Sequence, residues 1–187
     1  MIRRRRSAFA KDRRGVAAVE FALVAPLMVF CYLGVSILAS ALLVQRRVEH
    51  VASTLADLVA QQATTSPGEL SDICTVANTI MQPYSTSSTA LKMRVSSIQE
   101  DASGALTVGW SNNCQGMTAL TKGATYTGPA SSYITTSQSI IIAEVTYTYT
   151  SPLGATNISW LPGSYAFSNK FYLQPRESQN VTCATCT

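Results

Sequence analysis

The sequence has a single histidine, and only 13% of its 187 residues are charged. Enzymes that use a side-chain nucleophile need that nucleophile, a base and a group that orients the base, and this chain offers no such set. It also lacks a glycine-rich loop of the kind that holds phosphates. We therefore expect no enzymatic activity, no cofactor and no small-molecule substrate.

Cysteine is scarce as well, with five residues, and only Cys183 and Cys186 have the CxxC spacing. A zinc site of this type needs a second pair of ligands, which the chain does not supply. The sequence therefore predicts no metal site.

A long apolar run is the main feature that is present. From Phe21 to Val44 there are 24 consecutive residues without a charge. As a helix this run is roughly 36 Å long, which exceeds the hydrocarbon core of about 30 Å. Secretory signal peptides have shorter apolar cores, so we expect a retained membrane helix. Pro26 lies inside it and is expected to bend it locally.

The charges on either side of the run differ in sign. Residues 1–14 hold seven basic side chains and one acidic one, whereas the chain from Val48 onward holds five basic and eight acidic residues. The positive-inside rule then predicts a single-pass protein with a cytoplasmic N-terminus and an exported C-terminal part. The basic tail adjoins the apolar run and lacks interleaved aromatics, so we expect no nucleic-acid partner.

Glu20 stands at the start of the apolar run. A charge inside the bilayer costs on the order of 2.5–3.5 kcal/mol or more. Glu20 is therefore expected to need a partner of opposite charge. The alternative, which the sequence leaves open, is a solvated carboxylate at the level of the lipid headgroups.

The periodicity of the remaining sequence predicts an α+β fold. One continuous helix is expected over residues 16–63, after a cytoplasmic leader of residues 1–15 and before an exported domain of residues 64–187. A second helix should start at a capping box formed by Ser66 and Glu69. Alternating apolar residues predict antiparallel strands that pack on the helices, at residues 91–95, 106–110, 138–150 and 165–173. Residues 112–137 show little periodicity and are expected to form a loop.

Four cysteines lie in the part expected to be exported, namely Cys74, Cys114, Cys183 and Cys186. An even number in an oxidising compartment indicates two disulfides, for which three pairings exist. We favour pairings that join the C-terminal two cysteines to Cys74 and Cys114. A direct bond between Cys183 and Cys186 stays open.

The segment RRGVAAVEFALVAPLMVF, which begins at Arg13, resembles the N-terminus of TadE-like and TadG-like proteins. These are pseudopilin-type components of tight-adherence (Tad, Flp-type) pilus machines. The resemblance rests on the basic residues, Gly15, the pair Glu20 and Phe21, and Pro26. It implies a pilin-like lollipop fold, cleavage by a prepilin peptidase between Gly15 and Val16, and an assembly role for Glu20 with Phe21 beside it.

Two functions follow from these expectations. The first is a minor pseudopilin of the bacterial inner membrane with a periplasmic domain, whose partners are the membrane, a prepilin peptidase and other pilins or pseudopilins. Whether it enters the extracellular filament stays open. The second is an uncleaved single-pass anchor whose periplasmic domain binds other envelope proteins.

Overall fold

The computed structural model describes residues 15–101, 103–128, 138–151 and 163–186. The predicted basic leader lies outside these residues, apart from Gly15. The chain divides into two compact units. We call residues 1–40 the helical unit and residues 41–187 the sheet unit, and we describe each by itself.

Helix α2, which spans Val16–Ala60, is the long helix that the sequence predicts. Within the helical unit its apolar side chains are exposed, including Phe21 at 72% and Leu23 at 74%. A helix that is apolar and uncovered all round is typical of a membrane span. By length and composition α2 is a candidate membrane span.

The sheet unit contains one four-stranded antiparallel sheet in the order β3-β2-β4-β5. Its strands are β2 (Leu91–Glu100), β3 (Leu106–Gln115), β4 (Ser139–Thr150) and β5 (Ser164–Leu173). All four strands were expected from the alternation of apolar residues. The long helix and the small antiparallel sheet confirm the α+β fold class.

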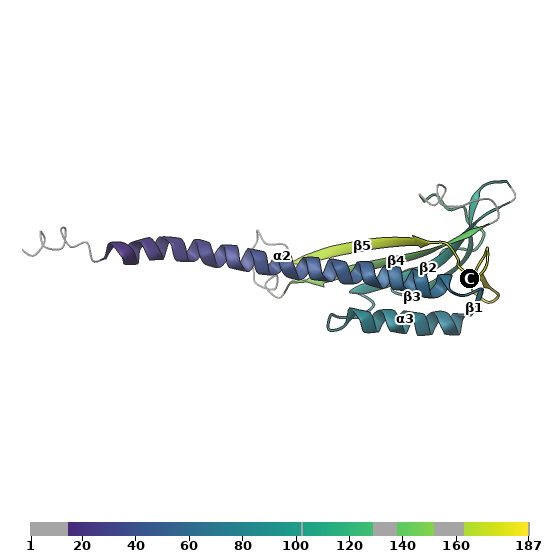
Figure 1. Ribbon diagram of the computed structural model, residues 1–187, viewed down its shortest axis with the longest axis horizontal. Coiled ribbons are helices and arrows are strands. Elements are labelled where there is room, and N and C mark those ends of the chain that lie inside the picture. Colours follow the sequence, from purple (N-terminus) through teal and green to yellow (C-terminus); the bar gives the residue numbers. More distant parts are fainter. Residues whose placement is uncertain (1–14, 102, 129–137, 152–162, 187) are drawn as a thin grey trace, which may run out of the picture. The chain divides into compact units, whose positions relative to one another are not determined.

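One face of the sheet carries the main core. The later part of α2 and helix α3 (Pro67–Met81) cover this face (Figure 1). The buried apolar residues of α2 recur every three or four positions, as expected for one face of a helix: Val44, Val48, Val51, Leu55 and Val59. Facing side chains of the sheet complete the core: Leu91, Met93, Val95, Ile141, Val145 and Tyr147.

The start of α3 confirms the predicted capping box. Ser66 Oγ accepts a hydrogen bond from the backbone N–H of Glu69 at 3.3 Å, and the Glu69 carboxylate accepts one from the Ser66 N–H at 2.8 Å. Pro67 takes the first helical position, where its missing N–H costs nothing. These bonds satisfy donors that a helix start leaves without partners.

The prediction of a loop over residues 112–137 is wrong at its beginning, because β3 continues to Gln115. Asn112 lies opposite Val95 of β2, and the side-chain amide of Gln115 donates to the carbonyl oxygens of Thr86 at 2.7 Å and Leu91 at 3.0 Å. Further on, Leu120 and Tyr126 pack against a second, smaller core on the other face of the sheet. Residues 129–137 of the predicted loop lie outside the described residues.

A short parallel pair of strands was missed. β1 (Thr64–Thr65) pairs with β6 (Thr182–Cys183). Next to it, the indole N–H of Trp110 donates to the carbonyl oxygen of Val181 at 2.7 Å, and both residues are buried. The C-terminal segment is thereby held against the sheet. Two-residue strands are too short to produce a periodic signal in the sequence.

The favoured disulfide pairing was wrong. Cys74 bonds to Cys114, and Cys183 bonds to Cys186, so the C-terminal cysteines pair with each other. The reason is the packing of α3 against β3, which brings the Cα atoms of Cys74 and Cys114 to 5.5 Å. The C-terminal segment is fixed instead by β1 and Trp110.

The two disulfides should differ in their effect on stability. In the chain-entropy view, removing the Cys74–Cys114 bond (sequence separation 40) should lower the free energy of unfolding by about 4 kcal/mol. Removing the Cys183–Cys186 bond (separation 3) should lower it by about 2 kcal/mol. Urea titration of the two Cys→Ser double variants measures the difference. Equal losses would contradict the prediction.

Candidate functional site

The start of α2 is open to another protein. Gly15 and Val16 are exposed, Val16 at 59%. A Cβ atom added to Gly15 would meet nothing within 4 Å, so packing within the described residues does not require glycine there. Gly15 therefore puts no side chain beside the Gly15–Val16 peptide bond. The carbonyl oxygen of that bond accepts a hydrogen bond from the Val19 N–H at 3.1 Å.

Glu20 lies one turn further along α2 and is exposed. Its surroundings are apolar, since Val16, Val19, Phe21 and Val24 are all exposed large hydrophobic residues. Within the described part of the chain Glu20 forms no ion pair. The helix thus presents a carboxylate on an apolar surface, where a cation from another chain could reach it.

Pro26 lies inside α2, and the helix continues through it. Because proline has no N–H, the carbonyl oxygen one turn before it loses its usual helical donor. The expected local bend at Pro26 stays a prediction.

Arg47 has a role that the sequence analysis did not foresee. Its guanidinium donates to the carbonyl oxygens of Ile80 and Gln82 and lies 5.4 Å from the ring centre of Tyr84. These contacts join α2 to the C-terminal end of α3. Arg47 is therefore part of the packing of the sheet unit.

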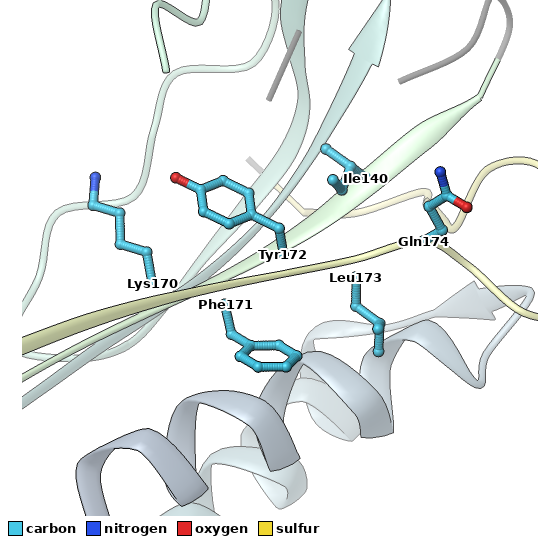
Figure 2. A pocket seen from close by; sticks show the side chains of 6 residues that line it. All are labelled: Ile140, Lys170, Phe171, Tyr172, Leu173 and Gln174. Carbon is cyan, nitrogen blue, oxygen red and sulfur yellow. The ribbon is translucent and has the colours of Figure 1, made fainter. Parts of the chain in front are cut away.

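Strand β5 forms one edge of the sheet, and its side chains alternate between the two faces of the sheet. Figure 2 shows Lys170 and Tyr172 on one side of the strand, and Phe171 and Leu173 on the side of the helix. Phe171 is 38% exposed. A hollow of about 530 Å³ lies along this part of β5.

A charged cluster lies on the sheet face opposite the helices. The side chain of Glu144, 8% exposed, pairs with Lys170 at 2.6 Å and with Arg94. Burial raises the pKa of Glu144, but the hydrogen bonds from Lys170 and Arg94 outweigh it, and the pKa lies below its ordinary value. Glu144 is therefore ionised and joins β2, β4 and β5 across the sheet.

Glu144→Gln should reduce the free energy of unfolding by about 1–3 kcal/mol at pH 7, because Arg94 loses its ionised partner in a mostly buried position. Because the native pKa is lowered, the carboxylate stabilises the fold above the ordinary pKa and loses that effect as the pH falls through the lower native value. The variant should therefore show a flatter loss of stability below about pH 4.

Lys170→Gln is the matched control, because the Lys170 side chain is 50% exposed and should contribute less than about 1 kcal/mol. Urea titrations between pH 3 and 7 measure all three proteins. A larger loss in Lys170→Gln than in Glu144→Gln would contradict the assignment.

Comparison with known proteins bears on the start of α2, where Gly15 and Glu20 lie. Residues 15–57 match the family model described as TadE-like protein. This segment is TadE-like. It contains Gly15, Val16, Glu20, Phe21 and Pro26, and it spans 43 of the 187 residues (57 − 15 + 1). No match was found among curated proteins or among solved structures.

The match supports a component related to Tad pili, with α2 as a membrane anchor. TadE-like pilus proteins are structural and are not enzymes. Among the described residues, no group of three or more His, Cys, Asp or Glu side chains is placed to hold a metal ion.

Proposed function

We propose that the protein is a minor pseudopilin of a Tad-type pilus machine, cleaved by a prepilin peptidase between Gly15 and Val16. The observation that carries this proposal is the TadE-like match, which begins at Gly15. The exposure of the bond and the open space around Gly15 support it.

Cleavage would change the electrostatics of the N-terminus. Hydrolysis of the Gly15–Val16 bond by water removes the basic leader and takes the formal net charge of the side chains from +4 to −2, since residues 1–15 carry +6. It also creates an ammonium group at Val16, four positions before Glu20. In a medium of low dielectric constant, an ammonium group of one subunit and the Glu20 carboxylate of its neighbour attract strongly.

This pairing makes assembly depend on processing. An uncleaved chain has no ammonium group at Val16, so the start of its helix provides no cation that could pair with the Glu20 carboxylate of a neighbour. A buried ion pair is favourable only with good geometry. Glu20 is therefore expected to set the register between adjacent helices as well as to hold them together.

The proposed topology places the N-terminus in the cytoplasm and the sheet unit in the periplasm. The charge difference across α2 favours this orientation. The two disulfides of the sheet unit support it, because disulfides persist in oxidising compartments.

Mass spectrometry of the protein from cells with and without the prepilin peptidase tests the cleavage. With the peptidase the chain should begin at Val16, and without it the leader should remain. Gly15→Leu should block cleavage, because a large side chain at Gly15 would meet the protease at the scissile bond. Gly34→Leu is the control, since Gly34 lies inside α2 with equally open surroundings and should leave cleavage intact. An intact leader in the presence of the peptidase would favour the uncleaved anchor.

Glu20→Ala should leave membrane insertion and cleavage intact but abolish pilus formation, because the ammonium of the neighbouring subunit loses its partner. Electron microscopy of filaments and fractionation of membranes measure both effects. Asp72→Ala removes an exposed acid from α3 and should leave pilus numbers unchanged. Normal filaments in Glu20→Ala would remove the assembly role of this residue.

A further inference from the structure

The two edges of the sheet are protected to different degrees. The β3 edge is covered by the segment that follows it: the Val108 N–H donates to Ala124 O at 2.9 Å, and the Tyr126 N–H donates to Leu106 O at 2.8 Å. The bond from Cys114 to Cys74 attaches the other end of β3 to α3. Unpaired sheet edges attract other strands, and folds usually block them in such ways.

The direction of the backbone groups on β5 follows from two bonds of β4. The Thr148 N–H donates to Ala90 O at 2.8 Å, before the start of β2, and the Ser151 N–H donates to Gly163 O at 3.1 Å, before the start of β5. Even-numbered residues of β4 therefore bond towards β2, and odd-numbered ones bond towards β5.

The odd-numbered residues of β5 bond towards β4, because each odd residue of β4 lies opposite an odd residue of β5. The even-numbered residues of β5 then direct their N–H and C=O groups away from the sheet. Four of them are Ser164, Ala166, Ser168 and Lys170. Among the described residues, no hydrogen bond outside the β4 ladder involves the backbone of these four. They form a row of donors and acceptors with the spacing of a strand.

Each side of this row has its own surface. On the side of α2, a groove of about 350 Å³ is lined by Phe171 and Leu173 and by Thr54 and Leu58 of the helix. A second groove, of about 240 Å³, continues from Ala166 to the exposed carboxylate of Glu49. An extended chain on the edge would place alternate side chains in these grooves.

We propose that the outward-facing edge of β5 binds an extended segment of a different envelope protein, which adds a fifth strand to the sheet. Backbone bonds to the even-numbered residues of β5 supply the affinity, as in other cases of strand addition. The helix-facing side chains of the segment are apolar where they cover Phe171. The side chain that lies beside Glu49 is basic, because within the described residues this carboxylate accepts one side-chain hydrogen bond, from Gln45 at 3.3 Å.

A second copy of this chain is a poor occupant for geometric reasons. The grooves show that β5 runs in the same direction as α2, since Ala166–Asn169 lie beside Gln45–Glu49 and Leu173 lies beside Leu58. Antiparallel pairing of two β5 edges would thus make the α2 helices of the two chains run in opposite directions. Two chains anchored in one membrane with the same orientation cannot pair in this way. Parallel pairing of identical edges needs a shift by an odd number of residues, so it cannot close a symmetric dimer.

The inference goes beyond the proposed function and does not depend on cleavage at Gly15. To test it, benzoylphenylalanine replaces Phe171 in the full-length protein. The protein is photo-cross-linked in the cells that make it, and the peptide attached to it is sequenced. We expect an adduct with another envelope protein, through a segment of alternating apolar residues that includes a basic one. A synthetic peptide of that segment should bind the detergent-solubilised full chain and slow the amide exchange of Ala166, Ser168 and Lys170.

Ala166→Pro supplies the decisive variant. It removes an N–H that points away from β4, so the ladder to β4 stays intact, and proline is tolerated at such edge positions. Adduct yield and peptide affinity should fall at least tenfold. Ala166→Val keeps the N–H and should match the wild type. Retention of the Cys74–Cys114 bond shows that both variants fold, and unchanged cleavage at Gly15 separates this test from that of the proposed function.

Three results would overturn the proposal. One is the absence of any adduct at Phe171. Another is an adduct formed only with a second copy of this chain. The third is an adduct whose yield is the same in Ala166→Pro and in Ala166→Val.

Discussion

Helix α2 has two different surfaces along one continuous backbone. Over Val16–Ser40 most of its side chains are apolar and none is buried, whereas from Ala41 onward one face is buried against the sheet. The change in pattern is therefore a change from lipid to protein as the partner of the helix. The buried face of α2 supplies a large part of the main core, to which α3 and the four-stranded sheet also contribute.

The opposite face of the sheet combines the smaller core with a set of paired polar groups. Glu144 joins three strands through Arg94 and Lys170, and the hydroxyls of Ser96 and Ser111 lie 2.9 Å apart in a buried position. Such groups cost free energy when buried, and they are stable only because each has a partner. They also fix the register of the strands, since a slip by one residue would separate the charges.

The sequence was informative wherever a pattern is repeated. The 24-residue apolar run and the alternation of Val145, Tyr147 and Tyr149 led to the long helix and to β4. It was uninformative where structure depends on contacts between distant segments, as in the polar end of β3, the pair β1–β6 and the disulfide partners of Cys74 and Cys183. The candidate residues Gly15 and Glu20 came from a local motif. The outward-facing backbone groups of β5 could be assigned only from the register of the sheet.

The pairing of cysteines has a practical consequence. Cys74, Cys114, Cys183 and Cys186 are all oxidised, which leaves Cys31 as the one thiol of the chain, and its side chain is exposed in the apolar part of α2. A maleimide dye or a spin label would therefore attach to the unmodified protein at a single known position. Its emission or its accessibility to paramagnetic quenchers would report the depth of the helix in a lipid bilayer.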